Sequence, residues 1–354
     1  MWPDTRLTQL LQIEHPILQA PMAGTCTAEL AAAVSNAGGL GAIGAGAMTV
    51  EQIEARLSQT RARTNRPLNL NFFMADPPPA PEVFARAAEA AAPTWKRLGL
   101  GPPPDAPPPR VARGFDEARM EILLAHRPAV ASFHFGAPSA EEIEALQEAG
   151  ILVLSSASTV AEARALAARG VDAIIAQGWE AGGHRGSHDV TGPDEGVGLF
   201  ALIPQVVDAV DVPVIAAGGV ADGRGVAAAF ALGASGVQIG TGFLLTPEAA
   251  TDEARRARLR ASDGSDTMQT QAISGRSARA ARSPWAEGMT GAPVAGFGDQ
   301  YALSKPVMEA APDEASFHLY GQAAALAPEA PAEEIVRALA ERAEAVFARL
   351  ALRL

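Results

Sequence analysis

Residues 212–242 read VPVIAAGGVADGRGVAAAFALGASGVQIGTG, and this stretch decides the fold. The runs Val212–Ala216 and Gly236–Ile239 are β-like, and the alanine-rich stretch Gly223–Leu232 between them is helix-like. A strand, a helix and a second strand in this order are typical of a βαβ unit in a parallel sheet. Both predicted strands end in glycine-rich turns.

The same alternation extends back to the N-terminus of the chain. The predicted strands are Ile17–Ala20, Leu40–Ile43, Pro67–Phe73, Ala129–Phe133, Leu152–Ser155, Asp172–Gln177, Val212–Ala216 and Gly236–Ile239. The predicted helices between them are Ala28–Asn36, Val50–Arg63, Pro81–Leu98, Ala140–Ala149, Val160–Arg169, Leu199–Val210 and Gly223–Leu232. Eight such units predict an α/β protein with a (β/α)₈ TIM barrel. A doubly wound open sheet is the alternative, because a strand count alone does not show closure.

The alternation ends after the eighth predicted strand. Residues 246–329 contain charged helix-like pieces and Gly/Ser turns, which predict a mostly helical cap inserted after strand eight. Ala332–Leu352 has apolar residues at helical spacing and is expected to pack on the barrel wall. We therefore predict a barrel over residues 1–245, a cap over 246–329 and a C-terminal helical region over 330–354.

Composition narrows the class of protein. The 354 residues are 48% apolar and 19% charged, which is typical of a globular protein with a sizeable core. The net charge of −12 argues against binding to nucleic acid. No stretch is apolar enough for a membrane span, and with Cys26 as the only cysteine no intramolecular disulfide can form. We therefore expect a soluble cytoplasmic protein. We also expect it to be a monomer or a homodimer. No metal-ligand spacing is recognisable.

The two glycine turns after strands seven and eight are candidate phosphate sites. In βα barrels the working groups lie at the carboxyl ends of the strands, and phosphate often binds after strands seven and eight. Strand seven leads into Gly218-Gly219, and strand eight leads into Gly240-Thr241. Glycine permits close backbone approach, and backbone N–H groups at a helix start suit a phosphate. A glycine that merely ends a strand is the alternative for either turn.

The loop after strand six carries a second group of candidates. Gln177 offers a donor and an acceptor, which suits the uracil-like edge of a flavin, and Gly182-Gly183 lets the backbone run close to a planar ring. His184 follows directly. A histidine in a polar glycine loop can serve as a base or a hydrogen-bond donor near neutral pH.

Taken together, these motifs resemble the nitronate monooxygenase family, formerly called 2-nitropropane dioxygenases. The matching pieces are Gln19-Ala-Pro-Met-Ala-Gly24, Asn69-Leu-Asn-Phe-Phe73, Ser132-Phe-His-Phe-Gly136, the loop 177–186, Ala217-Gly-Gly-Val220 and Gly236-Val-Gln-Ile-Gly-Thr241. Ser274-Gly-Arg276 and Tyr320-Gly-Gln322 extend the resemblance into the predicted cap.

The resemblance implies an FMN cofactor, a catalytic His184 and a substrate side in the subgroup that acts on propionate 3-nitronate. The implied substrate residues are His134, Tyr301 and Lys305. The implied FMN-binding residues are Pro21, Met22, Asn71, Gln177, Gly182, Gly183, Gly218, Gly219, Gln238, Ile239, Gly240 and Thr241.

The implied reaction is the oxidative denitrification of an alkyl nitronate by FMN and O₂, which yields a carbonyl compound and nitrite. The small-molecule partners are then a nitronate or nitroalkane and O₂. Two alternatives remain open. One is an NAD(P)H-dependent FMN reductase of the quinone or enoyl-acyl-carrier-protein type on the same barrel, and the other is a flavin- or phosphate-binding protein without turnover.

Overall fold

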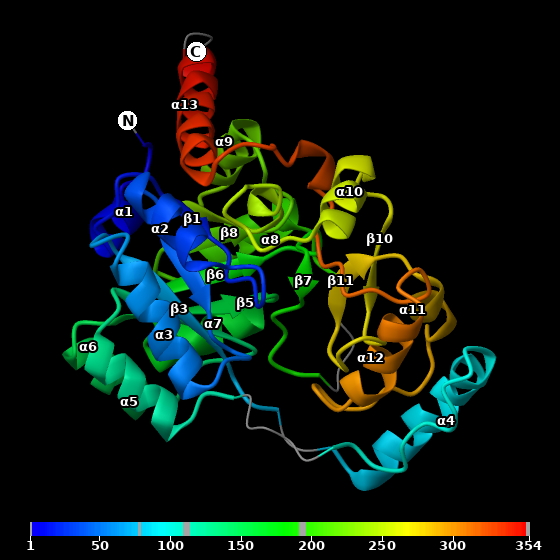
Figure 1. Ribbon diagram of the computed structural model, residues 1–354. Coiled ribbons are helices and arrows are strands. Elements are labelled where there is room, and N and C mark those ends of the chain that lie inside the picture. The colour runs from blue at the N-terminus through cyan, green and yellow to red at the C-terminus, as the bar shows by residue number, and fades with distance from the viewer. Residues whose placement is uncertain (1, 77–78, 109–113, 191–195, 352–354) are drawn as a thin grey trace.

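The barrel is formed by eight parallel strands, shown in Figure 1, a ribbon diagram of the computed structural model. The structure describes residues 2–76, 79–108, 114–190 and 196–351. The order around the sheet is β1-β9-β8-β6-β5-β4-β3-β2, and a parallel bridge between Leu18 and Leu40 joins β1 to β2 and closes it. The strands are β1 (Ile17–Gln19), β2 (Gly41–Gly44), β3 (Leu68–Phe73), β4 (Val130–His134), β5 (Leu152–Ala157), β6 (Ala173–Gln177), β8 (Val214–Ala217) and β9 (Gly236–Ile239).

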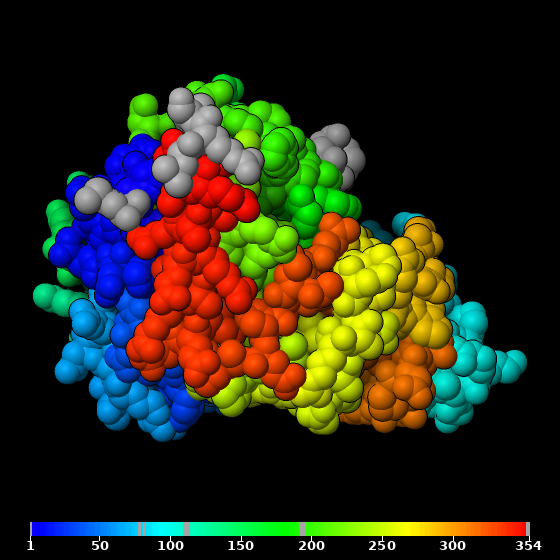
Figure 2. Space-filling view, turned by 90° about the horizontal axis from the view of Figure 1, so that it is seen from above, coloured from blue at the N-terminus to red at the C-terminus, as the bar shows by residue number. Residues whose placement is uncertain are grey.

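Helices surround this barrel. They are α2 (Ala28–Asn36), α3 (Val50–Arg61), α5 (Glu117–His126), α6 (Ala140–Glu148), α7 (Val160–Arg169), α8 (Leu199–Val207), α9 (Gly223–Ala231) and α13 (Ala332–Ala351). Local chemistry sets several of their starts, because Thr27 caps α2 by accepting from the Leu30 N–H, and Thr49 forms a capping box at α3. Figure 2 shows α13, in red, lying across the barrel between the N-terminal segment and the middle of the chain.

Two apolar layers fill the barrel region. One layer lies between the strands and the helices and includes Leu70 and Phe133. The other lies inside the barrel, where Leu154 and Ile175 meet Leu7 of the short helix α1 (Arg6–Leu11). Because α1 brings its buried leucines to this inner layer, it adds to the core of the barrel. No helix of the described residues is long and apolar enough to cross a membrane.

The cap forms a second lobe beside the barrel (Figures 1 and 2). Its elements are α10 (Glu253–Ala261), β10 (Thr267–Thr270), β11 (Ala278–Ala281), α11 (Pro284–Gly288) and α12 (Tyr301–Ala310). The short helices η1 (Thr241–Phe243) and η2 (Ala324–Leu326) flank it in sequence. The predicted, mostly helical cap therefore also contains an antiparallel strand pair.

One helix from the first half of the chain also packs on the cap. Helix α4 (Pro81–Arg97) lies beside α12, and the Nε1 of Trp95 donates to the carbonyl of Leu303 at 3.0 Å. Phe84 joins the same apolar cluster. The prediction of a helix over Pro81–Leu98 is confirmed, but a helical pattern does not reveal its packing partner, and the unpredicted α5 covers the barrel at this point.

A two-residue strand connects the barrel to the cap. Strand β7 (Gly183–His184), in the loop after β6, pairs antiparallel with β11 as the third strand of the sheet β10-β11-β7. The paired residues are Ala278 with His184 and Arg279 with Gly183. This pairing fixes the loop that carries His184.

The predicted (β/α)₈ barrel is confirmed, and the strand and helix ends differ from the predictions by a few residues. The largest differences at the ends of the barrel strands are in β8, which begins at Val214 instead of Val212, and in β5, which ends at Ala157 instead of Ser155. The last helix is observed from Ala332 to Ala351, and its predicted final residue, Leu352, lies outside the described residues. The same holds for residues 191–195 of the predicted loop after strand six.

Candidate active site

A cavity of about 220 Å³ lies where the carboxyl ends of the barrel strands meet the cap. Most of the predicted site residues line it, although they come from distant parts of the sequence. Those that do are Pro21, Met22, Asn71, His134, Gln177, Gly182, Gly183, His184, Gln238, Gly240, Thr241 and Tyr301. The fold therefore assembles one site from the predicted cofactor, catalytic and substrate residues.

Two amides of the barrel strands reach this cavity. Asn71, on β3, is buried, and its Nδ2 donates to the carbonyl of Ser132 at 3.1 Å and to the Ser132 hydroxyl at 3.0 Å. The Oε1 of Gln238, on β9, is buried and has no hydrogen-bond partner among the described residues. Gln238 thus presents an unused acceptor to the site.

Gln177 holds its own loop in place. Its Nε2 donates to the carbonyl of His184 at 2.9 Å, and its Oε1 accepts from the Gly186 N–H at 2.7 Å. The Nη1 of buried Arg185 donates to the Gln177 carbonyl at 2.5 Å. The amide predicted to face a flavin therefore also bonds the two ends of the loop 177–186 together.

His184 is held by the cap as well as by the barrel loop. Its backbone pairs with Ala278 of β11, and its Nε2 lies 2.8 Å from the Oγ of Ser274. Ser274 is fully buried and its Oγ also lies 3.3 Å from the carbonyl of Arg276. These contacts leave the imidazole little freedom to turn.

Both ring nitrogens of His134 are engaged by the protein. Its Nε2 lies 3.1 Å from the carbonyl of His184, and its Nδ1 lies 2.6 Å from the Oγ of Ser156. Because a carbonyl only accepts, Nε2 carries the proton, and Nδ1 accepts from the Ser156 hydroxyl. His134 lines the cavity, but its polar atoms position the His184 loop.

The two histidines are neutral at neutral pH. Burial, together with the nearby positive charge of Arg276, lowers the pKa of His184 from 6.5 to about 4. Burial likewise lowers the pKa of His134 to about 3, with smaller contributions from His184 and Arg276. Each imidazole can therefore act as one donor and one acceptor.

The positive charge beside these histidines is itself paired. Arg276 is buried, and its Nε and Nη2 donate to the two carboxylate oxygens of Asp76 at 2.7 and 2.5 Å. Its Nη1 donates to the carbonyl of Ser187 at 2.8 Å, and its guanidinium carbon lies 3.7 Å from the centre of the Phe135 ring. Arg276 thereby joins the cap to two loops of the barrel.

Aromatic rings form the wall around His184. The ring centres of Phe297, Phe317 and Phe73 lie 5.3, 6.1 and 6.2 Å from that of His184. Tyr301 packs edge-on against Phe317 at 5.7 Å. The chain is only 5% aromatic, but the fold gathers several of its aromatic side chains at the cavity.

Comparison with known proteins identifies the family of the chain. The sequence profile described as nitronate monooxygenase matches residues 4–342. The chain belongs to the nitronate monooxygenase family. A nitronate monooxygenase of Paraburkholderia phytofirmans is 42% identical over 342 residues, which cover 94% of this chain and 93% of that relative. The protein is thus an oxidoreductase.

Solved structures show the same relationship. A nitroalkane oxidase from Streptomyces ansochromogenes has a TM-score of 0.88 and 36% identity, and the match covers 98% of this chain and 99% of that one. FabK from Thermotoga maritima has a TM-score of 0.74 and 30% identity, and the match covers both chains in full.

Three of the predicted nitronate monooxygenase cofactor residues are not part of the cavity lining. Ile239 is buried in the apolar cluster near α13. Gly218 and Gly219 have φ angles of +100° and +69°, which favour glycine. A Cβ on Gly218 would lie 2.8 Å from the Ala181 N, so close packing of two loops requires a glycine there.

Lys305 also lies outside the cavity. Its side chain is 68% exposed, and its Nζ lies 3.6 Å from the Oε1 of Glu309, one helical turn away on α12. The spacing of Tyr301 and Lys305 predicted a shared helix face. Positions four apart share a face only approximately, and a long lysine side chain turns readily to water.

Sequence reasoning assigned no role to several residues of the site. The motif Ser274-Gly-Arg276 was visible as part of the family resemblance, but the contact between Ser274 and His184 was not. Phe297, Phe317 and Arg255 had no distinguishing pattern, because only the folded cap brings them to the cavity. Among the described residues, no group of three or more His, Cys, Asp or Glu could hold a metal ion.

The lowered histidine pKa values predict how stability depends on pH. Between pH 6.5 and about 4, an unfolded chain protonates His184 and His134 while the folded protein leaves them neutral. The free energy of unfolding should therefore decrease as the pH falls through this window. Urea denaturation at several pH values tests the trend, and NMR titration, with the His184 signal assigned from a His184→Asn variant, tests the cause. A His184 titration midpoint near 6.5 would contradict the account.

Proposed function

We propose that this enzyme oxidises alkyl nitronates, propionate 3-nitronate or similar compounds, with FMN and O₂, and forms a carbonyl compound and nitrite. The observation that carries the proposal is the position of His184. Its imidazole is neutral, contacts the Ser274 hydroxyl and is surrounded by aromatic rings. It lines the same cavity as the amides and glycines that are predicted to bind the flavin.

The residues of the cavity fit an FMN molecule. The buried, unpartnered Oε1 of Gln238 needs a donor, which the imide N–H or the ribityl hydroxyls of a flavin supply. Gly182, Gly183 and Gly240 leave the cavity wall free of side chains at three points. Thr241 begins the short helix η1, so its turn offers N–H groups to a phosphate, with Gly218 and Gly219 in the neighbouring turn.

Bound FMN would supply the electron-accepting chemistry, and the protein would supply orientation and electrostatics. The Pro21-Met22 backbone and Asn71 would face the ring, while Phe73, Phe297 and Phe317 would exclude water from the reacting carbon. Hydrogen bonds to the oxygens of an anionic nitronate are stronger in such a dry site than in water.

His184 would position the nitronate. With Nε2 held by Ser274, Nδ1 is the nitrogen that can serve the substrate, and its proton depends on which way the Ser274 hydroxyl donates. A neutral imidazole whose conjugate acid has a pKa of about 4 is a weak base. The enzyme should therefore turn over preformed nitronates faster than neutral nitroalkanes.

Gly240→Val tests the cofactor site. The φ of Gly240 is −107°, so the backbone accepts a side chain, but the branched methyl groups would enter the cavity beside Ala20 and Met22. We expect the Kd for FMN to rise roughly tenfold or more. Flavin content and FMN titration of the apoprotein measure this, with Gly288→Val, at a site with open space, as the control. Unchanged flavin binding would place the phosphate elsewhere.

His184→Asn tests the catalytic role. Because the neutral imidazole is a weak base, we expect turnover of preformed nitronates to slow by about one to two powers of ten through loss of one hydrogen bond to the anion. A loss of about 10²–10⁴ in the turnover of neutral nitroalkanes would instead identify His184 as a general base. Oxygen uptake with both substrate forms, at equal flavin content, measures the difference. Wild-type kcat/KM on both forms would show that His184 is only structural.

A further inference from the structure

The cap wall of the cavity contains three polar groups that neither the flavin assignment nor His184 explains. They are the Oγ1 of Thr251, the Nε of Arg255 and the Nδ1 of His318, and all three residues line the cavity. Each of these atoms is buried and has no hydrogen-bond partner among the described residues. Thr251 is only 7% exposed as a whole.

Such groups are costly unless something binds them. A buried polar group without a partner destabilises the folded protein, and native proteins contain few of them. Three on one cavity wall therefore indicate a place where a ligand completes the hydrogen bonds. Arg255 and Leu259 lie four residues apart on the face of α10 that meets the cavity, and Thr251 lies directly before Asp252, the N-cap of this helix.

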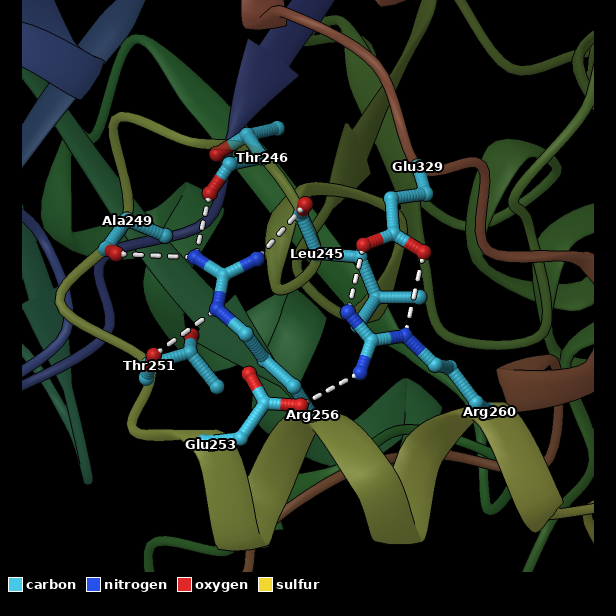
Figure 3. Close-up of polar contacts among 8 residues, drawn as sticks. All are labelled: Leu245, Thr246, Ala249, Thr251, Glu253, Arg256, Arg260 and Glu329. Atoms are coloured by element: carbon cyan, nitrogen blue, oxygen red, sulfur yellow. Dashed lines mark hydrogen bonds and ion pairs between the residues drawn. The ribbon is translucent and has the colours of Figure 1, made fainter.

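The helix that carries this wall is firmly anchored. Figure 3 shows the guanidinium of Arg256 donating to backbone carbonyls in the segment before α10, and that of Arg260 between two carboxylates. The carbonyls belong to Leu245, Thr246, Ala249 and Thr251, and the carboxylates belong to Glu253 and Glu329. Arg256 and Arg260 fix α10 and do not line the cavity, whereas Arg255 of the same helix does.

The wall carries one cationic side chain. Arg255 is the only lysine or arginine among the described residues that line the cavity. Its Nε lies 3.2 Å from Asp252 Oδ2, which is close enough for an ion pair but is not a hydrogen bond. Asp252 is the N-cap of α10 and accepts from the Arg255 N–H, so its carboxylate is partly used by the helix.

This wall belongs to the same chamber as His184. Phe317, whose ring contacts that of His184, directly precedes His318 in the chain. The carbonyl of His318 accepts from the Ala281 N–H of β11, the strand that also pairs with β7. One segment of chain thus carries both the aromatic wall beside His184 and the polar wall beside Arg255.

We propose that Arg255, Thr251 and His318 form a carboxylate subsite, which binds the distal carboxylate of a short nitronate while His184 holds its reacting end. The inference rests on the proposed function. It places a cationic side chain on the substrate side of the cavity, where the sequence predicted Lys305. A phosphate group of the cofactor has similar chemistry, and the experiment separates the two sources.

The first test compares two nitronates of equal chain length on Arg255→Met. For propionate 3-nitronate, KM should rise about tenfold to a hundredfold, as expected for one charged hydrogen-bonding partner, with little change in kcat. For propyl-1-nitronate, which lacks the carboxylate, KM should stay within about twofold. Arg255→Lys should recover part of the loss because it restores the charge.

The second test needs no turnover. Succinate has the shape and charge of propionate 3-nitronate, and butyrate lacks the second carboxylate. Isothermal titration of the flavin-loaded protein should show succinate binding more tightly than butyrate, and Arg255→Met should abolish the difference. Arg337→Met removes a positive charge from an exposed face of α13, away from the cavity, and should leave the difference intact.

The outcomes separate the possible failures. Three results would overturn the carboxylate subsite: equal losses on both nitronates in Arg255→Met, an equal loss in Arg337→Met, or a drop in FMN affinity in Arg255→Met. The last of these would assign Arg255 to the phosphate. If the wild type oxidises neither nitronate, the proposed function fails, while succinate binding that depends on Arg255 would still support the subsite. Wild-type protein that binds succinate no better than butyrate would overturn it.

Discussion

The backbone pairing of β7 with β11 is the interaction on which the active site depends. Gly183 and His184 belong to a loop of the barrel, but they also form the edge strand of the cap sheet. These two residues therefore connect the barrel to the cap at the cavity. The neighbouring Gly182 permits this, because a Cβ there would lie 2.4 Å from the Gly321 N. The position of His184 is thus set by backbone pairing with the cap and by side-chain hydrogen bonds from Gln177 and His134 of the barrel.

The chemistry of the cavity follows from that shared edge. Once His184 is enclosed between Phe297, Phe317 and the buried Arg276, protonation of its imidazole becomes unfavourable, and the ring stays neutral. His134 is neutral for the same reason and holds the loop through the His184 carbonyl. The two imidazoles therefore carry no charge beside an anionic substrate. The positive charge of Arg255 lies on another wall of the same cavity, the one that α10 contributes.

The barrel, and the strand-end and loop residues that it brings to the cavity, were predictable from sequence because their signals are local. Each strand, helix and glycine turn has a pattern that a few consecutive residues reveal, and the parallel barrel then brings the strand ends together. The cap was less predictable. Pairing of β7 with β11 joins residues far apart in the chain, and a two-residue strand has no pattern of its own. For the same reason the packing of α4 and the exposure of Lys305 could not be seen.

The central claim is that this cavity binds FMN and that a nitronate, not a nicotinamide nucleotide, reduces it. Anaerobic mixing of the purified yellow protein with propionate 3-nitronate, NADH or NADPH tests both parts, provided that the flavin released on denaturation is identified by chromatography. The account predicts FMN, and loss of the flavin absorbance near 450 nm only with the nitronate. Recovery of FAD, or rapid bleaching by NADH or NADPH with no response to the nitronate, would contradict it and favour a reductase on the same barrel.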